Sequence, residues 1–338
     1  MKYLIVFILI LGIVAGGWFA NAAWLSSPDA GAPIEVAIEK GLTYRQVRDA
    51  LASKGLVVPF AYDAYARIDS TARQPKAGAY EFRAGTSYRD IARSLFIGQT
   101  RDEVSVRVIE GKTITDEAKV LKDLGHDVGA FTALVGQSRG VAPFDRSLVV
   151  DYPFLSAIPE GQSLEGYLFP DTYRVWKDQA PEALVRKQLN ELNEKVIVPY
   201  AAQQKKSGMT WHEIVTLASI VEAEVRTPED RKIVAGIFLN RLNAPMRLQS
   251  DATLNYIIGE GRDRATAEDL KLNSPYNSYT HDGLPPGPIG NPSLSSLAAV
   301  LDPAITDYHY FLTDKEGKVY YGKTFDEHQR NRQRAYGE

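Results

Sequence analysis

The stretch Val36-Ala-Ile-Glu-Lys-Gly41-Leu-Thr43-Tyr-Arg-Gln46-Val47 carries the pattern that organises the first third of this 338-residue chain. Its apolar and polar residues alternate as they do in a half-buried strand, and a glycine follows where a turn is needed. Thr43 then stands where a helix N-cap is expected, and Gln46 three residues later completes a capping box. The stretch therefore predicts a strand, a turn and a helix.

The same unit recurs twice. The copies are Tyr80-Glu-Phe-Arg-Ala-Gly85-Thr-Ser87-Tyr-Arg-Asp90-Ile91 and Val106-Arg-Val-Ile-Glu-Gly111-Lys-Thr113-Ile-Thr-Asp116. The aspartates suit the positive end of a helix. We assign the three units to one subdomain over residues 34–125. It is either a plain scaffold or a glycan-binding module, because units of this rhythm resemble LysM-type peptidoglycan-binding modules.

Residues 3–20 read YLIVFILILGIVAGGWFA and follow Lys2. An uncharged run of this length can just cross a membrane, and positive charge before it favours export of the rest of the chain. We predict a transmembrane helix as an anchor over residues 1–23 and a linker over residues 24–33. A cleaved signal peptide is the alternative, since Ala20-Asn21-Ala22 has the small-x-small form of a cleavage site.

Composition excludes several classes of function. Hydrophobic residues make up 44% and charged residues 24% of the chain, which is typical of globular proteins, and a net charge of -3 argues against nucleic acid as a partner. The absence of cysteine excludes a thiol nucleophile, and Thr216 stands where a zincin helix starting at His212 needs its second histidine. We expect no metal and no cofactor. Carboxylates, hydroxyls and aromatic rings remain.

The second part of the chain is predicted to be mainly helical. We expect a catalytic domain over residues 126–338 and an α+β fold overall. The predicted helices cover residues 183–198, begin at 211 and 228, cover 295–301 and follow the cap Thr324, with a hairpin over 308–321 and a short strand at Met246–Gln249.

The segment Leu217-Ala-Ser-Ile-Val-Glu222-Ala-Glu224-Val225 is the most informative for chemistry. Glu222 follows five residues whose only polar side chain is Ser219. Apolar surroundings raise the pKa of a carboxyl group, as a general acid requires. The positive charge of Arg226 would lower the pKa of Glu222 if the two side chains came into contact. Downstream loops at 248–253 and 274–292 mix aromatic rings with Asn, Ser and Thr, a composition that suits sugars.

Five segments together resemble the YceG-like family of endolytic murein transglycosylases. They are Leu164-Glu-Gly-Tyr-Leu-Phe-Pro-Asp-Thr-Tyr173, Leu217–Glu222, Met246-Arg-Leu-Gln-Ser-Asp251, Tyr276-Asn-Ser-Tyr279 and Gly283-Leu-Pro-Pro-Gly287. The resemblance implies a bacterial inner-membrane protein with a single span, a LysM-like subdomain and a catalytic domain in the periplasm. It implies a lyase that cleaves the MurNAc-β-1,4-GlcNAc bond of peptidoglycan and leaves 1,6-anhydroMurNAc ends, thereby setting the length of nascent glycan strands.

The resemblance places the catalytic glutamate at Glu222. Its carboxyl would protonate the glycosidic oxygen and then deprotonate the C6 hydroxyl that attacks the anomeric carbon. Residues expected to bind the substrate are Gln249, Asp251, Tyr276, Asn277, Tyr279 and Glu224. Peptidoglycan synthases are the expected protein partners. A hydrolytic muramidase with a second carboxylate and a non-catalytic peptidoglycan-binding protein remain alternatives.

Overall fold

The computed structural model describes residues 14, 16–25, 33–98, 103–176, 181–259 and 266–337. The chain divides into two compact units. The first contains residues up to Glu103 with residues 176–178, and the second contains residues 104–175 and 179–338. The small sheets and many helices confirm a mixed α+β fold.

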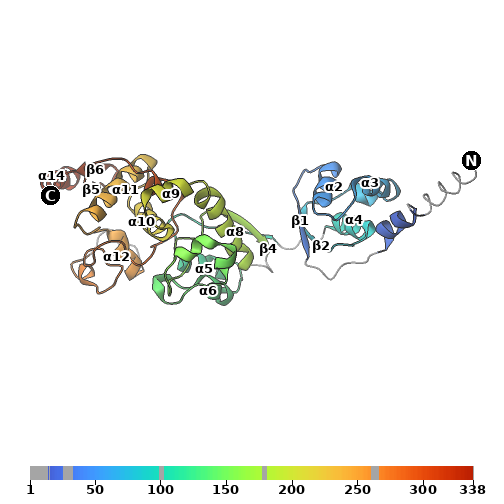
Figure 1. Ribbon diagram of the computed structural model, residues 1–338, viewed down its shortest axis with the longest axis horizontal. Coiled ribbons are helices and arrows are strands. Elements are labelled where there is room, and N and C mark those ends of the chain that lie inside the picture. The colour runs from blue at the N-terminus through green and yellow to red at the C-terminus, as the bar shows by residue number, and fades with distance from the viewer. Residues whose placement is uncertain are drawn as a thin grey trace, which may run out of the picture. The chain divides into compact units, whose positions relative to one another are not determined.

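The first unit places helices between and after two antiparallel strands (Figure 1). In the register, Ile34 pairs with Phe82 and Ile38 with Gly78. Thr43 forms the predicted capping box with Gln46. The elements are β1 (Ile34–Ile38), α2 (Tyr44–Ser53), α3 (Pro59–Ile68), β2 (Gly78–Phe82) and α4 (Tyr88–Ile97). The sequence analysis did not predict α3, which has no side-chain cap and begins at a proline.

The predicted membrane anchor lies mostly outside the described residues, which omit 1–13 and 15. Residues 16–24 are helical, and the rings of Trp18 and Trp24 contact Phe60 and Tyr65 of the first unit. Among the described residues no helix has both the length and the apolar character needed to cross a bilayer.

The third strand-turn-helix motif forms as predicted, but most of it belongs to the second compact unit of the chain. Its strand β3 (Glu103–Arg107) pairs with β4 (Thr172–Trp176), and its helix α5 (Ile114–Asp123) starts at the capping box of Thr113 and Asp116. Its apolar side chains join the core of the second unit. The boundary between the compact units therefore falls at 103/104, whereas the sequence analysis drew its domain boundary at 125/126.

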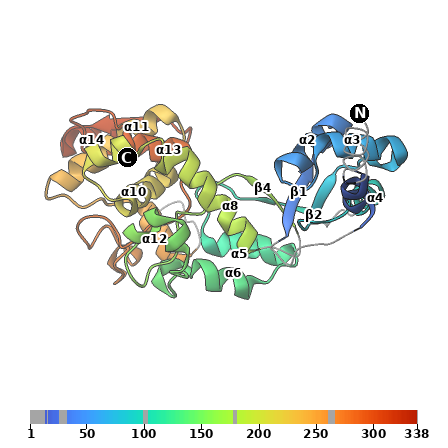
Figure 2. The ribbon, with the colours of Figure 1, turned by 45° about the vertical axis from the view of Figure 1, so that its right-hand side comes forward.

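Helix α10 (Trp211–Glu224) lies at the centre of the second unit (Figure 2). Helices α11 (Pro228–Asn243), α12 (Asp251–Ile258) and α13 (Leu294–Leu301) pack around it. The other helices are α6 (Val128–Val135), α7 (Leu148–Asp151), α8 (Glu182–Leu192), α9 (Ala201–Ser207) and α14 (Phe325–Tyr336). Strands β5 (Tyr310–Thr313) and β6 (Val319–Gly322) form the predicted hairpin, with Tyr310 opposite Gly322.

The predicted strand at Met246–Gln249 is absent, and the prediction was wrong. Gln249 has a φ of 50°, a left-handed conformation that interrupts extended backbone. The backbone groups of the segment bond to other elements instead. Arg241 Nη1 donates to the Leu248 carbonyl, and the Gln249 N–H donates to the Ser278 carbonyl at 3.1 Å.

Helix α11 approaches the segment after α13 so closely that only glycine fits at position 236. A Cβ atom there would lie 2.4 Å from the Ala304 carbonyl oxygen. Gly236→Ala should therefore destabilise the protein by about 2 kcal/mol, because overpacking against backbone outweighs the gain in helix propensity of about 1 kcal/mol. Thermal unfolding of the full chain measures the effect. An unchanged or higher midpoint would show that the two segments can separate at little cost.

Candidate active site

Two acidic residues stand at the end of helix α10. The helix begins at the capping box of Thr210 and Glu213, and every residue from Ile214 to Val221 is buried. A helix that is buried around its circumference belongs to the core. Glu222 and Glu224 follow this run. Because residues two apart on a helix point about 200° apart, the two carboxylates enter different surroundings.

Glu222 is held by an ion pair and by the start of another helix. Arg231 Nη2 donates to Glu222 Oε1 at 2.7 Å, and the two side chains are 13% and 8% exposed. Glu222 Oε2 accepts hydrogen bonds from the Ser293 N–H at 2.9 Å, from Ser296 Oγ at 2.7 Å and from Ser293 Oγ. Ser293 is the N-cap of α13, where negative charge is favoured. Glu222 thus joins α10, α11 and α13.

Glu224 faces a cleft instead. Burial raises the pKa of its carboxyl group, and the negative charge of Asp251 raises it further. The hydrogen bond from Ser250 Oγ and the positive charge of Arg241 act to lower this pKa, but burial is the largest effect. Glu224 is also the last residue of α10, where the negative end of the helix dipole disfavours a carboxylate. A carboxyl group with a raised pKa beside open space has the properties of a general acid.

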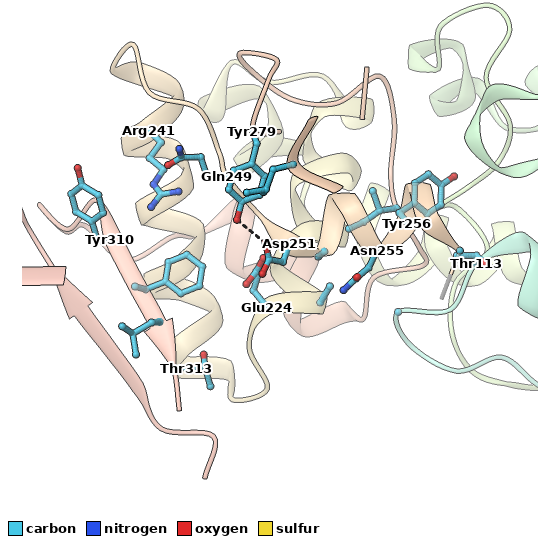
Figure 3. Close-up of a pocket in the computed structure, with 18 of the residues that line it drawn as sticks. Thr113, Glu224, Arg241, Gln249, Asp251, Asn255, Tyr256, Tyr279, Tyr310 and Thr313 are labelled. Carbon is cyan, nitrogen blue, oxygen red and sulfur yellow. Dashed lines mark hydrogen bonds between the residues drawn. The ribbon is translucent and has the colours of Figure 1, made fainter. Parts of the chain in front are cut away.

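The cleft has a volume of about 900 Å³, and all its walls belong to the second unit. Figure 3 shows Glu224 and Asp251 near its middle, with Tyr310 and Thr313 on one side and Tyr256 and Thr113 on the other. The walls come from α5, α10, α11, α12, β5 and α14. Because the cleft extends on both sides of Glu224, it suits a polymeric substrate that extends past this residue in both directions.

The structure brings together four of the predicted substrate-binding residues. Glu224, Gln249, Asp251 and Tyr279 line the cleft, and Tyr279 Oη donates to Asp251 Oδ1 at 2.6 Å. Ser250 lies outside the lining, and its Oγ donates a hydrogen bond to Glu224 Oε1. Within the described ranges, no group of three or more acidic or histidine side chains is placed to hold a metal ion.

Tyr276 and Asn277 lie behind the cleft. The Asn277 side chain is fully buried, and its Nδ2 donates to the carbonyls of Leu270 and Leu272. The Tyr276 ring packs against Tyr256 with centroids 5.1 Å apart. These contacts favour a role for both residues in holding the loop that presents Tyr279.

Backbone strain is concentrated at the cleft. In the described part of the chain only two non-glycine residues have positive φ, Arg139 at 64° and Gln249 at 50°, and both line the cleft. The Arg139 N–H donates to Tyr256 Oη at 2.8 Å, and its guanidinium lies 5.8 Å from the centre of the same ring. Strained residues that are held by their surroundings occur preferentially at functional sites.

Comparison with known proteins identifies the family of the chain. The sequence model of the YceG-like family matches residues 36–334. The chain belongs to the YceG-like family. A crystal structure of a YceG-like protein from Listeria monocytogenes is similar with a TM-score of 0.60 at 30% identity, covering 90% of this chain and 100% of that one.

Two relatives carry the name endolytic murein transglycosylase. The protein from Streptococcus pneumoniae strain D39 is 33% identical, over 97% of this chain and 64% of the relative. The protein from Bacillus subtilis strain 168 is 29% identical, over 95% of this chain and 91% of the relative. This YceG-like chain therefore spans about two thirds of the length of the streptococcal protein.

The YceG-like segment Leu164–Tyr173 contributes a buried carboxyl group behind the cleft. Glu165 Oε1 accepts from the Ile114 N–H at 2.8 Å, and Glu165 Oε2 accepts from Ser138 Oγ at 2.5 Å and from Tyr256 Oη at 3.2 Å. Burial raises the pKa of Glu165 to about 7, although these hydrogen bonds act to lower it. One side chain thus connects α5, the turn at Ser138 and α12.

Sequence analysis did not single out several side chains of the cleft. They are Arg139, Arg241, Tyr256, Tyr310 and Phe325, together with Ser250, which lies outside the lining and bonds Glu224. Only Ser250, next to Asp251 in a quoted motif, had a signal that could have identified it. The others come from separate helices, a turn and the hairpin, whose convergence no local pattern predicts.

The two glutamates of α10 should differ in their effect on stability. Glu222→Gln should lower the free energy of unfolding by about 3 kcal/mol, because it leaves the buried Arg231 without its charge partner. Glu224→Gln, the same change two residues later, should leave stability nearly unchanged or raise it, because burial already disfavours the ionised Glu224. Denaturant unfolding of both variants measures this. Equal losses would contradict the assignment of Glu222 to the ion pair.

Glu165 should make stability depend on pH. Its pKa is raised from 4.5 to about 7, so the folded protein holds the proton more tightly than the unfolded chain, and stability falls as pH rises through this window. The slope is about 1.4 kcal/mol per pH unit for one group. Glu165→Gln should be less stable than the wild type at about pH 5, with a gap that narrows towards about pH 7. A gap independent of pH would exclude this titration.

Proposed function

We propose that this chain is an endolytic lytic transglycosylase of bacterial peptidoglycan and that Glu224 is its catalytic acid and base. The observation that carries the proposal is a desolvated carboxyl group in the middle of a cleft that is open on both sides of it. The names of the streptococcal and Bacillus relatives support the same substrate and reaction. The substrate is the glycan strand, and the bond is the one between MurNAc and GlcNAc.

The proposed chemistry needs one proton carrier and no water. Glu224, in its protonated form, donates to the glycosidic oxygen as the bond from the anomeric carbon to that oxygen breaks. The resulting carboxylate then takes the proton of the C6 hydroxyl of the same MurNAc, whose oxygen bonds to the anomeric carbon and closes the 1,6-anhydro ring. Glu224 ends in its starting form. The attack is intramolecular, which gives it a large effective concentration over solvent water.

The neighbours of Glu224 suit these two steps. Asp251 raises the pKa of Glu224, and its own negative charge can stabilise positive charge that develops at the anomeric carbon. Tyr279 orients Asp251 through their hydrogen bond, while Ser250 orients Glu224. Gln249, held in a strained conformation at the cleft, is placed to bond sugar hydroxyl or acetamido groups.

The contacts of Glu222 support Glu224 over Glu222 for this role. The sequence places the acid at Glu222, and that stays a prediction. However, both oxygens of Glu222 already accept hydrogen bonds, and the residue does not line the cleft.

The proposal extends to the location of the protein. The apolar run of residues 3–20 supports a single span in the inner membrane, with the remainder in the periplasm. In the first unit, two helices connect two antiparallel strands, an arrangement that supports a LysM-like role in holding glycan. Cleavage of nascent strands at the membrane would set their length beside the peptidoglycan synthases, the proposed protein partners.

Digestion of purified sacculi tests the catalytic assignment. The wild type should release muropeptides with anhydro ends, and Glu224→Gln should release fewer by a factor of at least about 1,000, because it has no proton to donate. Glu222→Gln is the matched control and should keep its activity at temperatures where it is folded. Since burial raises the pKa of Glu224, activity should fall as pH rises through that pKa.

The products separate the alternatives. A hydrolase that uses Asp251 as a second carboxylate adds water, so its products are heavier by about 18 Da. A binding module releases nothing. If folded Glu222→Gln is inactive while Glu224→Gln works, the acid is Glu222 and the proposal for Glu224 fails.

A further inference from the structure

One end of the cleft is built by the hairpin and by helix α14, far along the chain from Glu224. Tyr310, Phe311 and Thr313 of β5 line this end, and Phe325, His328 and Tyr336 of α14 complete it. In Figure 3, Tyr310 and Thr313 stand on the opposite side of Glu224 from Tyr256. A strand whose scissile bond lies at Glu224 would extend along this wall.

Phe325 is the unusual side chain of this wall. It is 55% exposed, and it is the only phenylalanine or tryptophan in the described part of the second unit that is classed as exposed. It occupies the first position of α14, directly after the cap Thr324. Single exposed apolar residues are common on protein surfaces. An exposed ring that lines a cleft, however, is placed where a ligand can cover it.

The other rings at this end contact Phe325 without a parallel stack on it. Tyr310 is stacked on His328 with centroids 5.5 Å apart, and the Arg241 guanidinium lies 5.7 Å from the Tyr310 ring centre. Phe325 meets Tyr310 edge-on at 61° and His328 at 37°, with centroids 6.1 and 6.3 Å away. Neither contact is a parallel stack, which agrees with the high exposure of Phe325.

Hydrogen bonds hold this wall in place before any ligand arrives. Asn331 Nδ2 donates to the Tyr321 carbonyl at 2.9 Å, and Tyr336 Oη donates to the Thr313 carbonyl at 2.6 Å, so α14 is tied to both strands. Arg241 Nε donates to the His309 carbonyl at 2.6 Å and ties the hairpin to α11. A preorganised ring loses little entropy when it binds.

We propose that Phe325 is the stacking platform of a sugar subsite at the α14 end of the cleft, which binds an N-acetylhexosamine ring of the glycan away from the cleaved bond. The inference rests on the proposed function. A pyranose ring has an apolar face of C–H groups and a polar rim. Phe325 offers the matching flat apolar surface, and Thr313 and Tyr336 lie on the same wall for the rim.

Kinetics of the full chain on polymeric glycan strands and on a tetrasaccharide test the subsite. Phe325→Ala should raise KM for polymeric strands about fivefold, the fold-change that an aromatic contact supplies, with kcat changed less than about twofold. The ratio of kcat/KM for polymeric strands to kcat/KM for the tetrasaccharide should fall accordingly. Phe325→Trp should restore the low KM, because it restores a flat ring. Tyr320→Ala, on β6 and outside the cleft lining, is the matched control and should behave as the wild type.

Binding separates this inference from the proposed function. In the Glu224→Gln background, affinity for purified glycan strands should fall about fivefold when Phe325→Ala is added. This readout needs no turnover, so it stands even if the wild type forms no anhydro ends, an outcome that refutes the function alone. Unchanged affinity and KM in Phe325→Ala would overturn the subsite. So would an equal loss in Phe325→Trp and Phe325→Ala, or a loss confined to kcat.

Discussion

The ion pair between Glu222 and Arg231 fixes the end of helix α10, and the rest of the site depends on where that helix ends. Because Glu222 also accepts bonds from the first turn of α13, three helices meet at one carboxylate. The interaction is mostly buried, so solvent screens it little. It contributes to holding the final turn of α10, whose last residue, Glu224, lies on the side of the cleft.

The two glutamates of α10 have different surroundings. Glu222 contacts an arginine and the N-terminus of a helix. Glu224 has a helix C-terminus, a desolvated position and a neighbouring aspartate, which together favour its neutral form. One residue, Ala223, separates them. The helical rotation between the two positions directs one carboxyl group to the neighbouring helices and the other to the cleft.

Local signals predicted much of the fold. Capping residues located the starts of α2, α5, α10 and α14, and alternation located β1, β2 and the hairpin. The predictions differ from the structure where contacts between residues far apart in the sequence determine the local conformation. The segment Met246–Gln249 has strand composition, yet bonds from Arg241 and to Ser278 hold it in an irregular path. The third strand-turn-helix unit was grouped by its pattern with the first two, but its strand pairs with residues about 70 positions later.

The site was predictable in part for the same reason. The segment with both glutamates could be identified, and Gln249, Asp251 and Tyr279 do line the cleft. The contacts of Glu222 with Arg231 and Ser293 could not be predicted from that segment. These are tertiary contacts, and patterns of residues that are neighbours in the sequence do not predict them.

The position of α14 has a consequence for the order in which the cleft is completed. The chain is synthesised from its N-terminus, so residues 310–336, which form one side of the cleft, are made after Glu224 and Asp251. Until then one side of the cleft is missing. Proteolytic trimming at α14, or a bulky fusion placed there, would consequently alter how far a polymer can extend through the cleft while leaving the acid itself intact.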